Sequence, residues 1–109
     1  MSKPEIRSLF EHLEELRRRA RLSQVDVAEL ANTTRRSYIS WCKGEGPAAR
    51  KKPDLQYAIF ILEQGRRRNE LPIRGHDRRP GTAERRREVI KELRACYPIN
   101  PYQEAQGRA

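Results

Sequence analysis

The chain has few of the residues from which a large core is built. Of its 109 residues, 36% are hydrophobic and 6% aromatic, whereas an average globular domain is ~45–50% apolar when glycine is counted too. Charged residues also make up 36%, against the usual ~25%. We expect one domain with a modest core, of a kind that often gains stability from a partner.

The patterns of metal sites, cofactor sites and catalytic centres are also missing. Cys42 and Cys96 stand far apart, with no Cys-X-X-Cys pair and no cysteine–histidine spacing suited to zinc. We expect them to be reduced thiols packed on helices. No paired acid and base and no glycine-rich phosphate loop is present. The sequence therefore predicts a protein that is not an enzyme and holds neither metal nor cofactor.

Long apolar runs and strand-like alternation are absent as well. No run approaches the ~20 apolar residues of a transmembrane helix, and the N-terminus has no apolar stretch typical of a signal peptide. We therefore expect a cytoplasmic protein without a membrane partner. No segment alternates apolar and polar residues as a strand does, and no internal repeat is visible.

What the sequence does have is positive charge in two blocks. The net charge is +9, from 24 Lys and Arg against 15 Asp and Glu. Residues 1–34 are nearly balanced, whereas residues 35–52 carry six basic residues against Glu45, and residues 66–94 carry eleven against five acidic ones. Clustered positive charge is the electrostatic signature of a polyanion-binding surface.

Apolar residues recur every three or four positions in several stretches, which is the spacing of a helix face. Ser23 and Asp26 form a variant of the capping box, and Asn32 suits the position after a helix because it tolerates the left-handed conformation. The helices expected are 4–20, 22–31, 34–43, 54–64 and 82–96. The sequence thus predicts an all-α fold of about four helices with an extra C-terminal helix.

The composition divides this chain into four parts. Residues 1–65 form the expected helical domain, with a basic loop at 47–53, and 66–81 form a basic, exposed linker. Residues 82–97 hold a C-terminal helix whose apolar stripe is too narrow for it to be stable alone. It docks on its own domain or on a sister subunit. The tail, 98–109, is expected to be irregular.

The stretch 22–43, LSQVDVAELANTTRRSYISWCK, has the pattern of a helix-turn-helix that reads DNA. Ala28 is the small residue that lets two helices approach, and Asn32 reverses the chain. Tyr38 and Trp41 give the second helix an apolar inner face, while its other residues are polar. A recognition helix needs this division because one face packs and the other enters the major groove.

Here the chain resembles the Cro/cI family of phage repressors, also called lambda-repressor-like or XRE-type, over about residues 5–64. Three features carry this likeness. The stretch 22–28 has the family's LSQ–A opening, and the run 31–37 (ANTTRRS) is similar to 434-type repressors. Cys42-Lys43-Gly44 then precedes a basic stretch, as in the family. A weaker likeness is to phage regulators encoded beside anti-CRISPR genes. Both imply a transcriptional regulator, more often a repressor, that binds an inverted repeat of double-stranded DNA as a homodimer.

Three residues of the expected recognition helix, 34–43, are the expected base contacts: Arg35, Arg36 and Ser40. An arginine can donate two hydrogen bonds to guanine O6 and N7 in the major groove, and the resemblance places base-reading glutamines at the two arginine positions. Tyr38 and Ile39 stand where the family has one β-branched residue. Either Tyr38 or Ile39 can therefore face inward, which leaves the rotation of the helix undecided by one position. For the same reason the sequence does not decide whether Arg35 or Arg36 is the main base contact.

A second set of residues is expected to contact the DNA backbone. The resemblance matches Gln24 and Thr34 to phosphate-positioning residues, and Gln24 also stands at a helix N-terminus, which can hold a phosphate oxygen. Basic residues beside the recognition helix add affinity that falls with salt. The full set is Gln24, Thr34, Ser37, Lys43, Arg50, Lys51 and Lys52.

Two other functions fit the same composition. A helical protein-binding module could use this scaffold to inhibit or recruit a host protein, and a nonspecific nucleic-acid binder could use its charge alone. The first predicts no DNA shift at moderate salt, and the second predicts salt-dependent binding without sequence preference.

Overall fold

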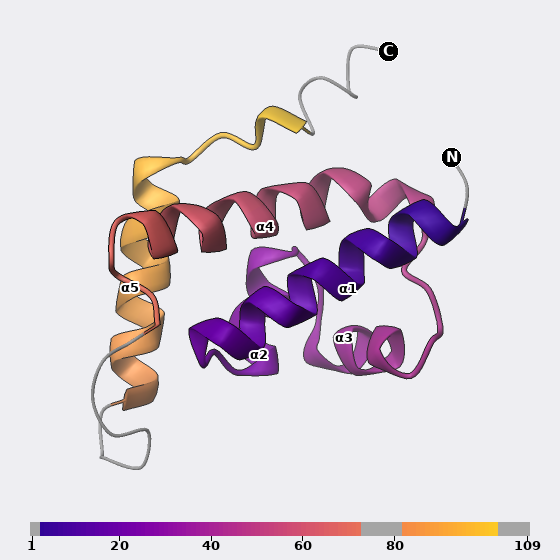
Figure 1. Cartoon of the computed structure of the whole chain (residues 1–109), viewed down its shortest axis with the longest axis horizontal. Helices are drawn as coiled ribbons and strands as arrows, with labels where there is room; N and C mark the ends of the chain where they lie inside the picture. The colour runs from indigo at the N-terminus through magenta and orange to yellow at the C-terminus, as the bar shows by residue number, and fades with distance from the viewer. Residues whose placement is uncertain (1–2, 73–81, 103–109) are drawn as a thin grey trace.

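Helices account for most of the chain that the structure describes. The computed structural model describes residues 3–72 and 82–102 (Figure 1). No strand occurs within these ranges, so the predicted all-α fold with an extra C-terminal helix is confirmed. In chain order the elements are α1 (Lys3–Ala20), α2 (Gln24–Leu30), α3 (Arg35–Cys42), the 3-10 turn η1 (Ala49–Lys51), α4 (Lys52–Arg67) and α5 (Thr82–Cys96).

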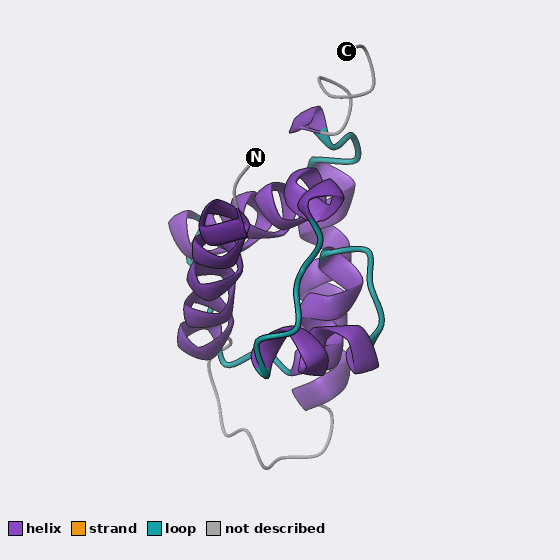
Figure 2. Ribbon diagram, turned by 90° about the vertical axis from the view of Figure 1, so that its right-hand side faces the viewer, coloured by secondary structure: helices purple, strands orange, loops and turns teal. Residues whose placement is uncertain are grey.

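The core is centred on α1 and α4, the two elements in most extensive contact. α4 runs along the top of the view in Figure 1, with α1 crossing beside it, α2 and α3 below and α5 at one end. Figure 2 shows α1 and α5 on opposite sides of the helical framework. The apolar stripe predicted for the first helix is buried in this core, together with α4 side chains: Ile6, Phe10, Leu13 and Leu16 with Leu55, Ala58, Ile61 and Leu62.

The C-terminal helix docks on its own domain. Val89, Ile90 and Leu93 of α5 are buried in the same core, and α5 contacts both α4 and α2. Gly65 of α4 makes this approach possible, because a Cβ there would lie 2.6 Å from Leu71 Cδ1 and 3.0 Å from Leu93 Cδ1. Of the two docking modes left open by the sequence, the structure shows the one within the chain.

Two predicted boundaries are wrong. The fourth helix, expected over 54–64, continues to Arg67, because Gly65 faces the core inside the helix. The stretch expected to be an exposed linker from residue 66 also contributes Leu71 to the core, only 4% exposed. The rest of that linker, residues 73–81, lies outside the described residues.

The basic loop contains a short stretch of regular structure, and the start of the tail packs against α4. Part of the loop at 47–53 forms η1, and α4 already begins at Lys52. The start of the tail is held against α4, where the Tyr57 hydroxyl donates to the carbonyl of Tyr97 at 2.6 Å and the Asn100 amide donates to the carbonyl of Pro53 at 3.2 Å. Residues 103–109 lie outside the described part.

Within 3–72 and 82–102, no helix is long and apolar enough to cross a membrane. The same residues contain no group of three or more His, Cys, Asp or Glu side chains that could hold a metal ion. Cys42 and Cys96 are free and lie on helices as expected, but both are exposed instead of packed inside.

Candidate nucleic-acid interface

The turn between α2 and α3 is built by local hydrogen bonds. At the start of α2, the Ser23 hydroxyl accepts from the Asp26 amide at 3.1 Å and Asp26 Oδ2 accepts from the Ser23 amide at 3.0 Å, which completes the predicted capping box. At its end, Asn32 has a φ of 54°, in the left-handed region. The Thr33 amide donates to the Ala28 carbonyl and the Asn32 amide to the Glu29 carbonyl, as in a Schellman motif. The predicted helix-turn-helix connection is therefore present.

The next helix, α3, starts at a threonine cap. Thr34 has an extended backbone, and its hydroxyl oxygen accepts a hydrogen bond from the Ser37 amide at 3.1 Å. The Thr34 hydroxyl in turn donates to the Ser37 hydroxyl at 3.2 Å. This cap fixes the N-terminal turn of α3, where Arg35 and Arg36 stand.

The inner face of α3 determines its rotation. Tyr38 is fully buried and Trp41 is 8% exposed, and both rings make edge contacts with Phe10 of α1, at centroid distances of 5.1 and 5.7 Å. Ile39 is only half-buried. Tyr38 therefore occupies the inward position that the sequence left undecided between residues 38 and 39.

This rotation separates the two arginines. At about 100° per residue, Arg36 lies about 160° from Tyr38 and about 140° from Trp41 around the helix, directly opposite the buried face. Arg35 lies only about 60° from Tyr38, toward the edge of the exposed face. Both side chains are exposed. Arg36, Ser40 and Lys43 follow one another at i, i+4 and i+7, so they share the outer face of the helix.

The sequence-predicted contact residues on and beside α3 differ in exposure. Thr34, Lys43 and Arg50 are exposed, while Gln24, Ser37 and Ser40 are half-buried. Gln24 reaches the C-terminal end of α3, with its side-chain amide 4.0 Å from Cys42 Sγ. Among the described residues, no ion-pair partner is found for Arg35, Arg36, Lys43 or Arg50, whose charges thus stay available to an anion.

Two of the predicted backbone contacts have their charges engaged within the chain. The Lys51 ammonium donates to the Asn32 carbonyl at 2.8 Å and pairs with Asp54 at 2.9 Å. Its side chain is 17% exposed, and it ties the turn before α3 to the start of α4. The Lys52 ammonium pairs with Glu5 of α1 at 3.1 Å. The structure therefore gives both lysines a bracing role that the run of basic residues did not reveal.

A carboxylate behind α3 gathers three partners. Glu14 of α1 accepts two hydrogen bonds from Arg17, at 2.6 and 2.8 Å, one from Arg18 at 3.1 Å and one from the Tyr38 hydroxyl at 2.8 Å. Burial alone would raise the pKa of Glu14, but the hydrogen bonds from Arg17 and Tyr38 outweigh it and hold this pKa below its usual value. Burial, reinforced by the neighbouring Glu14 carboxylate, raises the pKa of the Tyr38 hydroxyl far above its usual value.

Arg7 is a second residue behind α3 that sequence reasoning missed. Its guanidinium donates to the carbonyl of Trp41 at 2.5 Å and to the carbonyl of Gly46 at 2.9 Å, and it lies 5.3 Å from the ring centre of Phe10. A cation at the C-terminal carbonyls of a helix is favourable, so Arg7 holds the end of α3 and the following loop together. These groups are 34 and 39 positions apart in the chain, and no local pattern marks such a contact.

Together these contacts make α3 a short helix with a buried, fixed inner face and a cationic outer face. Such a surface can donate hydrogen bonds to base edges and attract phosphates. No protein-family model matches this chain, and comparisons with curated proteins and with solved structures found no significant match.

Proposed function

We propose that this chain is a sequence-specific DNA-binding regulator of transcription that inserts α3 into the major groove. The observation that carries the proposal is the position of Arg36. It lies opposite the buried Tyr38 and Trp41, on a helix fixed from behind by Glu14 and Arg7. A guanidinium presented in this way can form a bidentate pair with guanine, worth ~1–3 kcal/mol of discrimination.

The remaining exposed groups divide between bases and phosphates. Arg35 and Ser40 flank Arg36 on the outer half of α3 and are the further base contacts that we propose. For the DNA backbone we propose Thr34 and Ser37 at the start of α3 and Gln24 at the start of α2. We add Lys43 and Arg50, which follow the end of α3 and have no ion-pair partner among the described residues. Lys51 and Lys52 contribute by bracing the turn and α4.

A single α3 offers few base contacts, so the proposal includes two half-sites. A homodimer on an inverted repeat doubles the contacts, with half-sites about one turn of DNA apart. The resemblance to phage repressors extends the proposal to a phage or prophage repressor that acts on its own operon.

The first experiment selects binding sites from randomised duplex DNA with the full chain and measures affinities by gel shift at several salt concentrations. We expect an inverted repeat with guanine in each half. Arg36→Gln is expected to weaken binding to the selected site ~5- to 150-fold, the equivalent of ~1–3 kcal/mol, and to relax preference at that guanine. Arg35→Gln should cost less.

Arg66→Gln is the matched control, because Arg66 is an exposed arginine outside α3 with no ion-pair partner among the described residues. It removes the same charge and should leave sequence preference unchanged. Equal effects of the Arg36 and Arg66 variants would contradict the assignment of α3. Binding without any selected sequence would favour a nonspecific binder, and no binding at moderate salt would favour a protein-binding module.

A further inference from the structure

Three of the five basic residues of α5 share one side of the helix, whereas Arg85 pairs with Glu88 and Arg86 with Asp26. At about 100° per residue, Arg87, Lys91 and Arg94 fall within an arc of about 60°. The acidic residues Glu84, Glu88 and Glu92 follow a neighbouring line of their own. The three cations extend over seven residues, which is about 10 Å along the helix axis. We name Arg87, Lys91 and Arg94 the α5 cation row.

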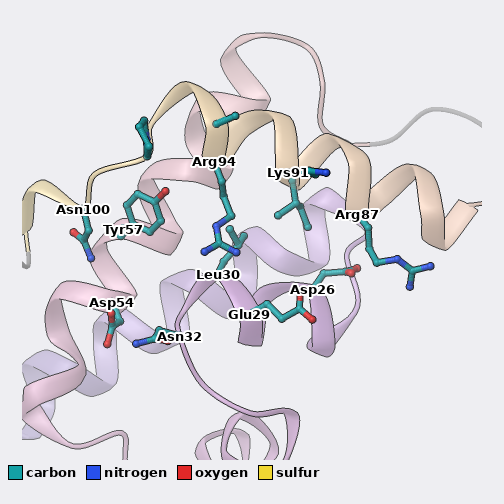
Figure 3. Close-up of a pocket in the computed structure, with 13 residues that line it drawn as sticks. Asp26, Glu29, Leu30, Asn32, Asp54, Tyr57, Arg87, Lys91, Arg94 and Asn100 are labelled. Atoms are coloured by element: carbon teal, nitrogen blue, oxygen red, sulfur yellow. The ribbon is translucent and has the colours of Figure 1, made fainter.

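The α5 cation row borders a groove between α5 and α2, of about 560 Å³. Figure 3 shows the row along one helix, with Arg94 reaching toward Leu30 of α2. All three side chains are exposed. In the part of the chain that the structure describes, none of them has an ion-pair partner.

The carboxylates across the groove do not neutralise this row. Asp26 is paired with Arg86 at 2.9 Å, and Asp54 is paired with Lys51 at 2.9 Å. Glu29 is the remaining carboxylate of the groove and has no ion pair with a described residue. Three positive charges therefore face one negative charge, and the groove edge keeps an excess of positive charge that attracts an anion.

The groove beside the α5 cation row extends to the turn before α3. Asn32, in the turn directly before α3, lines the same groove. Figure 1 shows α2 between α5 and α3, with the N-terminal end of α5 on the same lower side of the view as α3. The ion pair between Arg86 and Asp26, a residue that is only 6% exposed, fixes α5 on α2. The row is thus held at a fixed position across α2 from α3, along a groove that includes the turn before α3.

We propose that the α5 cation row is a second contact surface for DNA, one that binds the phosphate backbone beside the base pairs read by α3. This inference rests on the proposed function. A row of about 10 Å is long enough for its cations to contact more than one phosphate of a DNA strand. The row adds affinity and lengthens the contacted DNA, and it contributes no base recognition.

The test compares two double variants that remove equal charge. Arg87→Gln with Lys91→Gln removes two members of the row. Arg66→Gln with Arg67→Gln removes two exposed cations at the end of α4 that likewise have no ion pair with a described residue. Affinity for the selected duplex is measured by fluorescence anisotropy over a range of salt concentrations. Hydroxyl-radical footprints are recorded, and melting temperatures confirm that the variants fold.

The α5 double variant is expected to make binding less dependent on salt. The magnitude of the slope of log K against log salt should fall by about 1.8, the value for two phosphate contacts. Its footprint should lose protection at one border of each half-site, while base preference stays as in the wild type. The α4 double variant should keep the wild-type slope and footprint.

Equal slopes for both double variants, or an unchanged footprint with the α5 variant, overturn the inference. If Arg36→Gln weakens DNA binding while the α5 double variant binds like the wild type, the α5 cation row is not a DNA contact, and the proposed function of α3 stands. If the wild type binds no duplex at all, the proposed function fails, and this inference fails with it.

Discussion

The hydroxyl of Tyr38 in α3 donates a 2.8 Å hydrogen bond to Oε1 of Glu14 in α1. Tyr38 is fully buried, so this bond links α3 to α1 from the buried side of α3. It fixes the rotation of α3 and, with it, the direction in which Arg36 points.

Tyr38→Phe should lower the free energy of unfolding by about 1.5–3 kcal/mol, the usual contribution of a hydrogen bond to a charged group. The aromatic contacts with Phe10 and Trp41 would remain. Urea unfolding of Tyr38→Phe, Glu14→Gln and the double variant gives the coupling between the two residues. Additive effects of the two substitutions would contradict the contact.

Glu14 should also make stability depend on pH. Its pKa in the folded protein lies below its unfolded value of 4.5, because the hydrogen bonds from Arg17 and Tyr38 outweigh the effect of burial. The stabilisation is therefore complete above pH 4.5 and is lost as the pH falls through the lower, folded pKa. Urea midpoints should drop on acidification between about pH 5 and pH 3. The drop should be smaller in Glu14→Gln, and parallel curves would contradict the prediction.

The basic loop should separate into a bracing residue and a contact residue. Lys51→Met should lower the free energy of unfolding by about 1–2 kcal/mol, because the Asn32 carbonyl and Asp54 lose their partner. Arg50→Gln, at an exposed residue, should change it by less than about 0.5 kcal/mol. In DNA binding the order reverses, and Arg50→Gln should reduce the salt slope by about one.

Urea unfolding and anisotropy titrations on the same two proteins test this division. A lower salt slope with Lys51→Met, at unchanged stability, would show that Lys51 contacts phosphate instead of bracing the turn.

Asn32→Ala should lower the free energy of unfolding by about 1–2 kcal/mol, since alanine is strained in the left-handed region that Asn32 occupies at a φ of 54°. Asn32→Gly is the matched control and should stay near the wild type, because glycine adopts this conformation without a Cβ penalty. Both keep the backbone carbonyl that Lys51 binds. Thermal unfolding of the two variants measures this difference in stability. Equal losses of stability in both variants would exclude backbone strain as the cause.

Local features of the fold could be predicted because they depend on residues a few positions apart. The apolar stripe of α1, the capping box of Ser23 and Asp26, and the left-handed turn at Asn32 all follow from such short-range patterns. The extent of α4 could not be predicted in the same way. Gly65 looks like a helix end in the sequence, and only the packing of Leu71 and Leu93 against it explains a buried glycine inside the helix.

The roles of individual charges were the least predictable part of the candidate site. The run Arg50-Lys51-Lys52 looks uniform in the sequence. In the structure Lys51 contacts Asn32 and Asp54, and Lys52 contacts Glu5, so two of the three cations are engaged within the chain. Arg7, a residue of the first helix without any motif, supports the end of α3. Such roles depend on which acceptors the fold brings near each cation.

The sequence by itself determined the helices, the turn and the polar outer half of α3, because helix periodicity, capping and turn conformation act over a few residues. The tertiary structure alone decided that Tyr38 and not Ile39 faces inward, that α5 docks on its own domain, and that Arg36 lies opposite the core. These outcomes depend on contacts such as Tyr38–Glu14 and Arg86–Asp26, which join residues 24 and 60 positions apart. A side chain's direction is settled by the packing of those distant partners.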